Sequence, residues 1–146
     1  MTDSLKIRDF SIDDYDAVVN LWQISSLPYR PEGRDARDVI ETELKGGQAL
    51  FRVAELENNI VSAIFGTHDG RKGWINRLVV DPEYRRRGIA VKMIEDVEQL
   101  LDSMGIQIVA CLIEDWNTES SAFFTRIGYF EHDDIKYFSK RKNQKS

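Results

Sequence analysis

The residues best suited to chemistry lie in one stretch, Leu78-Val79-Val80-Asp81-Pro82-Glu83-Tyr84-Arg85-Arg86-Arg87-Gly88-Ile89-Ala90. An apolar, strand-like run leads into a tight turn here, and the turn leads into a long amphipathic helix. The first backbone amides of a helix have no partner within the helix and, together with the helix dipole, attract anions. Gly88 lets the backbone approach a ligand closely, small Ala90 leaves room beside it, and the three arginines add positive charge. Several consecutive amides suit a pyrophosphate better than a single carboxylate, so we expect a phosphorylated carrier to bind.

The same stretch has a simpler interpretation, because a run of charges at a helix start is usually solvated surface. Its context favours the anion site, since it follows a predicted strand and is followed by a further strand and helix. A dinucleotide-binding fold does not fit. The loop is poor in glycine and follows the fourth predicted strand rather than the first strand of a repeating βαβ chain.

The elements that must position this stretch are predicted from the period of the apolar residues. Alternation and short apolar runs predict strands over residues 5–10, 49–54, 60–66, 74–80 and 106–113, and a pair of short strands within 129–138. Helical spacing predicts helices from residue 15 to before Pro28, and over 36–44, 88–104 and 118–127. The order β-α-α-β-β-β-α-β-α-β-β is that of a mixed α/β (α+β) domain.

Composition narrows the class of protein. The 146 residues are enough for one domain, which we assign to residues 1–140, with a basic C-terminal tail at 141–146. The net charge of −5 argues against nucleic acid as a partner, and no apolar run is long enough for a membrane span or a signal peptide. With one cysteine, Cys111, and two histidines, we expect no metal site, no disulfide framework and a reducing, cytoplasmic location.

The chain resembles the GNAT family of acetyl-CoA-dependent N-acetyltransferases over nearly its whole length. Residues 85–90 match the pyrophosphate loop of that family, and Asn117 followed by Gly128-Tyr129 matches its second signature. The hairpin, the turn at 69–73 and the chain length are also similar to the small YpeA-type subgroup. The resemblance implies the GNAT fold, in which a mixed, mostly antiparallel central sheet is flanked by helices.

The resemblance also implies where ligands bind. Acetyl-CoA would be the cosubstrate, with no metal, and would lie in a gap between the strands at 74–80 and 106–113. An acceptor pocket would be lined by Tyr29, Arg30, Trp74 and Asn76, for which ordinary surface or core packing is the alternative. The backbone of Leu78, Val79 and Val80 would run beside the pantetheine arm, Asn117 would contact the cofactor, and Arg85, Arg86, Arg87, Gly88, Ile89 and Ala90 would hold the pyrophosphate.

The chain departs from the family pattern where protons are moved. Phe124 stands where family members commonly have a tyrosine that protonates the departing thiolate. Asn76 and Leu112 stand where a carboxylate often takes the proton of the attacking amine. Glu114, at the end of the fifth predicted strand, is the candidate base acting through water, and a solvated loop acid beside Asp115 is its alternative interpretation.

These observations lead to two functional hypotheses. The first is transfer of an acetyl group from acetyl-CoA to a primary amine, of a small molecule or a protein N-terminus, by direct attack of the neutral amine. The second is an acyl-CoA-binding sensor or interaction domain that has lost catalysis. The acidic net charge favours a cationic amine acceptor. The resemblance leaves room for a homodimer.

Overall fold

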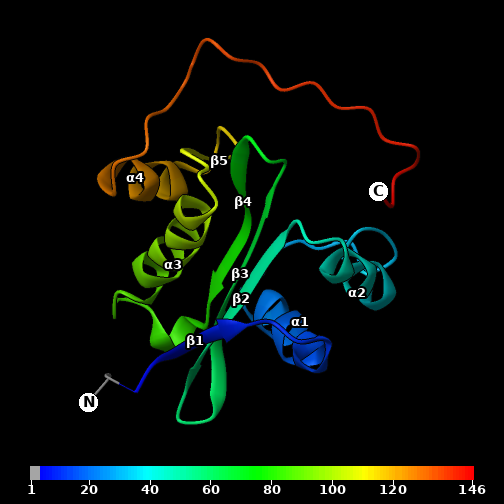
Figure 1. The fold of residues 1–146 in the computed structure, drawn as a ribbon, viewed down its shortest axis with the longest axis vertical. Coiled ribbons are helices and arrows are strands. Elements are labelled where there is room, and N and C mark those ends of the chain that lie inside the picture. The colour runs from blue at the N-terminus through cyan, green and yellow to red at the C-terminus, as the bar shows by residue number, and fades with distance from the viewer. Residues whose placement is uncertain (1–3) are drawn as a thin grey trace.

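The computed structural model describes residues 4–146, and the strands of this part of the chain form one sheet (Figure 1). The strands are β1 (Lys6–Asp9), β2 (Ala49–Leu56), β3 (Asn59–His68), β4 (Lys72–Val80) and β5 (Ile108–Cys111). Their order in space is the same as their order along the chain. The pairs β1–β2, β2–β3 and β3–β4 are antiparallel, whereas β4 and β5 are parallel. The parallel pair requires a crossover connection, which a helix supplies.

Helices cover both faces of the sheet. The helices are α1 (Tyr15–Ile24), α2 (Arg37–Lys45), α3 (Ile89–Ser103) and α4 (Thr118–Arg126), with short 3-10 turns at Ile12–Asp14 and Pro82–Tyr84. One face carries α1 and α2, and the other carries α3 and α4 (Figure 1). The predicted mixed, mostly antiparallel sheet flanked by helices is confirmed.

The larger apolar core lies between the sheet and α3. The apolar residues of this helix recur every three or four positions, so Met93, Val97 and Leu101 share the face that is buried against the strands. Ile64 of β3 and Ile75 of β4 oppose them from the sheet. Ile89, the first residue of α3, is buried in the same core, so packing against β2, β3 and β4 also holds the start of the helix.

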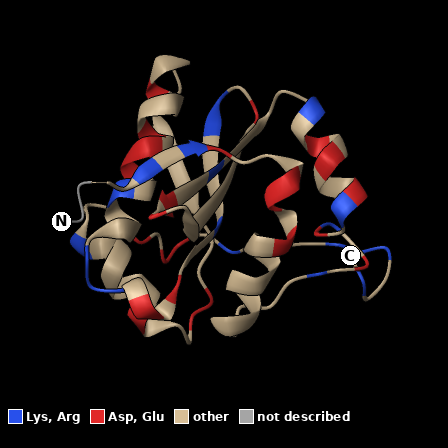
Figure 2. Cartoon of the chain, turned by 90° about the horizontal axis from the view of Figure 1, so that it is seen from below, with Lys and Arg blue, Asp and Glu red and all other residues tan. Residues whose placement is uncertain are grey.

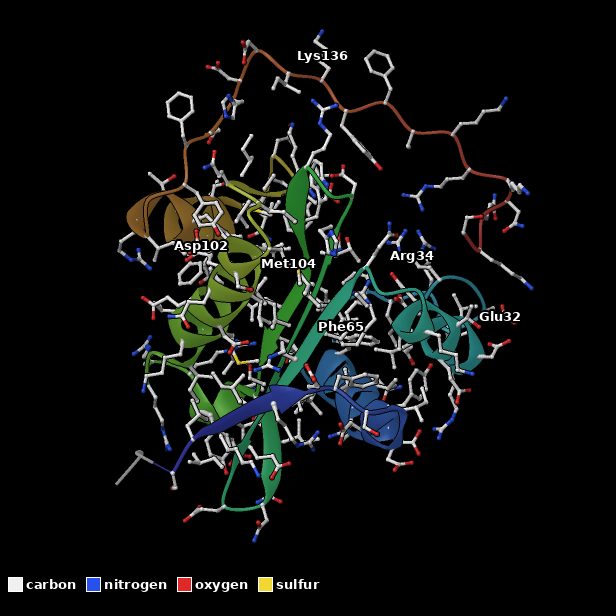
Figure 3. The ribbon with its side chains drawn as sticks, in the orientation of Figure 1. Glu32, Arg34, Phe65, Asp102, Met104 and Lys136 are labelled. Atoms are coloured by element: carbon white, nitrogen blue, oxygen red, sulfur yellow. The ribbon has the colours of Figure 1, made fainter. Side chains whose placement is uncertain are left out.

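The second core lies under α1 and is rich in aromatic rings. Phe51 and Phe65 stack with their centroids 3.9 Å apart, and Trp22 of α1 meets Phe65 edge-on at 5.4 Å. Figure 3 labels Phe65 on the side of the sheet that faces α1. Because large rings bury much apolar area with specific geometry, this cluster fixes α1 firmly on the sheet.

A polar cluster holds the start of α1 against β1. Ser11 and Asp14 form a capping box. The Ser11 N–H donates to Oδ2 of Asp14 at 2.8 Å, and Oγ of Ser11 accepts from the Asp13 N–H at 3.3 Å. Arg8 donates to both oxygens of Asp14 at 2.8 and 2.9 Å. These hydrogen bonds hold the pKa of the Asp14 carboxyl below its usual value.

The prediction of two short strands within residues 129–138 is wrong. The structure leaves this segment without strands, and the sheet of the described residues ends at β5, which is itself shorter than the predicted 106–113. The polar run 131–134 interrupts the alternation. Ile135, Tyr137 and Phe138 stay 68, 67 and 88% exposed, so no burial offsets the entropy of ordering a strand.

Two further observations bear on the class of protein. No helix within residues 4–146 is both long and apolar enough to cross a membrane. In the same described part of the chain, no three His, Cys, Asp or Glu side chains lie close enough together to hold a metal ion. Figure 2 shows acidic and basic positions interspersed over strands and helices.

Candidate active site

The central feature of the site is the place where β4 and β5 separate. Their parallel pairing runs from Lys72 opposite Ile108 to Ile75 opposite Cys111 and then stops, although β4 continues to Val80. Over residues 77–80, β4 is therefore paired with β3 alone. Backbone N–H and C=O groups at such an edge can bind an extended ligand in the manner of an added strand.

A β-bulge lies where this separation begins. Phe65 of β3 is opposite Arg77 and Gly66 is opposite Ile75, so Asn76 is the extra residue of β4. The exposed Asn76 side chain donates from Nδ2 to Oγ1 of Thr67 at 2.9 Å. Bulges redirect the backbone and are frequent beside active sites. The position of Asn76 near the acceptor was predicted from the sequence, whereas the bulge and the partner Thr67 have no local sequence signal.

The predicted anion site lies at the next turn of the chain. Arg86 has a φ of 67° and Gly88 a φ of 76°, and this left-handed pair brings the chain into α3 at Ile89. No side chain caps the first amides of α3, and its first turn carries no acidic residue. A Cβ atom at Gly88 would meet nothing within 4 Å, so the space beside the backbone is open. The loop thus has the free amides and the room that a pyrophosphate requires.

The three arginines of this loop differ in their contacts. Arg85 donates from Nε to the Val80 carbonyl at 3.4 Å, and Arg87 lies over the Tyr84 ring at 5.0 Å. All three side chains are exposed. They place positive charge around the open amides without filling the space above them.

Asn117 lies at the start of α4 and acts as its N-cap. Its Oδ1 accepts from the backbone N–H of Ser120 at 3.1 Å. This bond satisfies one of the unpaired amides of the helix. The expected contact with a cofactor stays a prediction, and the structure gives Asn117 a structural role that its sequence position did not reveal.

Phe124, which replaces the family's tyrosine, packs in an aromatic cluster that contains one hydroxyl group, that of Tyr129. The half-buried ring packs edge-on against Phe123 and Tyr129, with centroid distances of 5.3 and 5.1 Å. Tyr129 has a hydroxyl close by, but it donates to Oε2 of Glu98 on α3 at 2.6 Å. Burial and this carboxylate raise the pKa of Tyr129 well above its usual value. No local sequence signal pairs Tyr129 with Glu98, because the two residues lie on separate elements.

The other candidates for proton transfer or nucleophilic chemistry are less favourably placed. Glu114 is exposed in the loop after β5, and its backbone carbonyl accepts from the Asn117 N–H at 2.9 Å. Burial raises the pKa of the Cys111 thiol to about 11, so this group stays protonated near neutral pH and is a poor nucleophile. In the part of the chain that the structure describes, neither side chain has a contact that indicates a role in proton transfer or nucleophilic attack.

The four predicted acceptor residues fall into two groups. Tyr29 is half-buried against Trp22 at 5.5 Å and accepts a hydrogen bond from Gln23, whereas Arg30 is exposed; both lie in the loop between α1 and α2. Trp74, on β4 beside the Asn76 bulge, lines a separate hollow of about 580 Å³. That hollow is lined by Asp69, Arg71, Lys72, Trp74 and Ile108.

An ion pair that could not be predicted from the sequence joins the α1–α2 loop to β4. Arg77, the residue after the bulge, lies 3.0 Å from Asp35 in the α1–α2 loop. The two residues are far apart in sequence and neither belongs to a motif, so no local signal could have paired them. Their contact brings the loop carrying Tyr29 and Arg30 onto β4.

The comparison with protein families gives a match over most of the chain. The model described as the acetyltransferase (GNAT) family matches residues 15–129. This range includes the separating strands, the loop before α3 and all of α4.

Solved structures share the fold. The PaiA N-acetyltransferase of Thermoplasma acidophilum, in complex with coenzyme A, has a TM-score of 0.78 at 18% identity, over 90% of this chain and 93% of that one. An aminoglycoside acetyltransferase from an uncultured soil metagenomic sample, in complex with trehalose, has a TM-score of 0.80 at 19% identity, over 97% and 98%. A Clostridium acetobutylicum protein described as a predicted acetyltransferase, with acetyl-CoA, has a TM-score of 0.75 at 16% identity, over 92% and 96%. At these identities the likeness shows the fold alone.

Proposed function

Because the chain belongs to the acetyltransferase (GNAT) family, we propose that it transfers an acetyl group from acetyl-CoA to a primary amine. The acceptor is a small molecule or a protein N-terminus. The observation that carries the proposal is the combination of the unpaired β4 edge over residues 76–80 with the uncapped start of α3. The resemblance to the small YpeA-type subgroup is part of the same proposal.

The residues around the gap suit both parts of acetyl-CoA. The edge of β4 at Leu78, Val79 and Val80 offers backbone groups to the amide-containing pantetheine arm. The loop from Arg85 to Ala90 offers free amides and positive charge to the pyrophosphate. When bound, acetyl-CoA supplies a thioester carbonyl that an amine can attack. A β4 amide near Leu78 or Val79 then polarises that carbonyl.

Proton transfer limits which amines react well. A lysine-type amine with a pKa of about 10.4 is neutral in only about one molecule in 10³ at pH 7, whereas an α-amino group near 7.7–8.0 is about a tenth neutral. A thiol with a pKa near 8.5 leaves tolerably as the thiolate, so the absence of an acid at Phe124 costs about 10²-fold. We therefore propose direct attack by an amine of low pKa, with Glu114 as the terminus of a water-mediated proton path.

The test of this function is release of the CoA thiol. The purified chain is mixed with acetyl-CoA and a panel of amines, which includes N-terminal peptides, diamines and aminoglycosides, and mass spectrometry identifies the acetylated product. The pH profile of kcat/KM is then compared for Glu114→Gln and for the neighbouring control Asp115→Asn. We expect Glu114→Gln to change the pH profile and Asp115→Asn to leave it as in the parent. An unchanged profile in Glu114→Gln removes Glu114 from the mechanism.

A second candidate is an acyl-CoA-binding domain without catalysis. Its support is that Phe124 lacks a hydroxyl, Tyr129 donates its own to Glu98, and Glu114 is exposed without a side-chain hydrogen bond among the described residues. Calorimetry separates the two candidates. Tight CoA binding without thiol release above background, across the whole amine panel, favours the sensor.

A further inference from the structure

Asp35 and Arg77 form a buried ion pair between the α1–α2 loop and β4. Nη1 of Arg77 lies 3.0 Å from Oδ2 of Asp35, and the two side chains are only 13% and 9% exposed. Nη1 has no partner that meets hydrogen-bond geometry, so charge attraction rather than a directed bond dominates the contact. Such pairs gain little net stability, because removing both charges from water offsets their attraction. The pair therefore calls for an explanation other than stability.

Each partner also makes contacts that fix its place. The Arg77 guanidinium lies 4.5 Å from the centroid of the Trp22 ring on α1. Asp35 accepts the backbone N–H of Arg30 at 2.6 Å through Oδ2, and its backbone carbonyl accepts the Tyr15 hydroxyl at 2.7 Å. The pair thus joins α1, the loop and β4 at one point. The loop contains no helix or strand. Asp35 lies near its end, and its carboxylate binds the backbone of Arg30 in its middle.

The position of Arg77 connects this cluster with the gap. Asn76, the residue before it, is the bulged residue of β4, and the pairing of β4 with β5 ends just before that residue. Any movement of Arg77 would shift the bulge, and any movement of Asp35 would shift the loop that carries Tyr29 and Arg30. Figure 3 labels Glu32 and Arg34 on the same loop, on the side of the molecule away from α4. The pair therefore links the loop that carries Tyr29 and Arg30 to the strand that carries Asn76, and these are the residues assigned to the acceptor side.

We propose that Asp35 and Arg77 are positioning residues that set the separation between the α1–α2 loop and the bulge of β4, and thereby select which amines reach the gap. The inference rests on the proposed acetyl transfer and goes beyond it by assigning acceptor selection to a pair buried between the α1–α2 loop and β4. The loop position relative to β4, rather than the chemistry of the loop side chains alone, then decides the size of the accepted amine.

The experiment compares Asp35→Asn with the matched control Glu32→Gln. Both variants remove one negative charge from the same loop, but the Glu32 side chain is exposed and pairs with the exposed Lys145 side chain at 3.4 Å. For Asp35→Asn we expect kcat/KM for the amine to fall about 10- to 100-fold, mainly through KM, while the Kd for CoA stays within about twofold. Glu32→Gln should leave kcat/KM and KM for the amine and the Kd for CoA unchanged. Arg77→Lys, which keeps the charge but loses the planar fork, should retain part of the selectivity.

A readout that does not need turnover keeps this inference separate from the proposed function. Hydrogen exchange of the amides at 27–36 should be faster in Asp35→Asn than in Glu32→Gln, because the loop has lost its attachment to β4. If the parent acetylates no amine, the proposed function fails, and exchange alone decides whether the pair holds the loop. The inference is overturned by equal exchange in the two variants. It is also overturned by a Kd for CoA that changes in step with the amine KM.

Should Asp35→Asn fail to fold, the double variant Asp35→Asn/Arg77→Met removes both charges and leaves no unpaired cation. It should fold with a mobile loop and a broadened range of accepted amines. A double variant with the selectivity and loop exchange of the parent would overturn the inference.

Discussion

Replacing Gly88 by alanine tests the anion site, and the glycine at the other end of α3, Gly105, provides a matched control. Gly88 precedes α3 with a φ of 76°, and Gly105 follows it with a φ of 77°. A Cβ atom would meet nothing within 4 Å at either position, so each alanine suffers only the strain of a left-handed backbone. That strain is about 1–2 kcal/mol, which corresponds to a Tm lower by about 2–8 °C for a domain of this size. The two variants should therefore lose similar stability.

The two variants should differ in their affinity for CoA. The new methyl group at residue 88 enters the open space where the uncapped amides of α3 would meet a pyrophosphate. Loss of one charge-assisted hydrogen bond is worth about 1.5–3 kcal/mol, so the Kd should rise about 10- to 150-fold in Gly88→Ala. Gly105→Ala should bind CoA as the parent does. Calorimetric titration with CoA and thermal denaturation are measured on both variants.

The reasoning would be refuted by equal CoA affinities in two variants of equal stability. That result would mean that the start of α3 does not contact the ligand. A large loss of stability in Gly88→Ala alone would also contradict it, because the strain would then not be matched. The parent chain is titrated first, because the comparison requires that the parent bind CoA.

Three further perturbations follow from contacts in the structure. Arg8 lowers the pKa of Asp14, so the stabilisation by this pair is fully present above the unfolded pKa near 3.9 and is lost as pH falls through the lower folded pKa. Urea denaturation should show Asp14→Asn less stable than the parent at pH 7, with the difference shrinking as the pH falls below about 3.9. A difference that stays constant with pH would contradict this. Gly73→Ala should cost about 1–3 kcal/mol in the same assay, because the added Cβ would overlap the buried Leu101 side chain, and an unchanged midpoint would show that this helix contact yields easily. Tyr129→Phe should lower stability by about 1 kcal/mol and leave kcat unchanged, since the hydroxyl donates to α3, whereas a tenfold fall in kcat would make this tyrosine the missing acid.

The elements predicted well are those with a strong local signal. The apolar residues of α3 repeat at helical spacing with Gly88 and Gly105 at the ends, and the structure places the helix at Ile89–Ser103 against a prediction of 88–104. The β2–β3 hairpin was predicted from two apolar runs around a turn and is present. Residues 129–138 were mispredicted, because their apolar residues suggested strands but a strand also needs a neighbour and a buried face.

The candidate site divides in the same way. The residue types and the spacing of the loop before α3 predicted an anion site, and the structure supplies a local geometry that suits one, with a left-handed Gly88 and uncapped amides. The bulge at Asn76 had no sequence signal, because it exists only in the register of β4 against β3. The commitment of the Tyr129 hydroxyl to Glu98 likewise depends on how α3 packs against the segment after α4.

By itself, the sequence determined which segment would form the loop and helix of the anion site, because turns, caps and helix starts depend on residues close together in the chain. Only the tertiary structure decided what surrounds that loop. The separation of β4 from β5 depends on the packing of the whole sheet. The Asp35–Arg77 pair depends on a loop and a strand that meet because α1 packs its aromatic face on the sheet. Contacts of this kind join residues distant in sequence, and their free energy comes from shared burial rather than from local conformational preference.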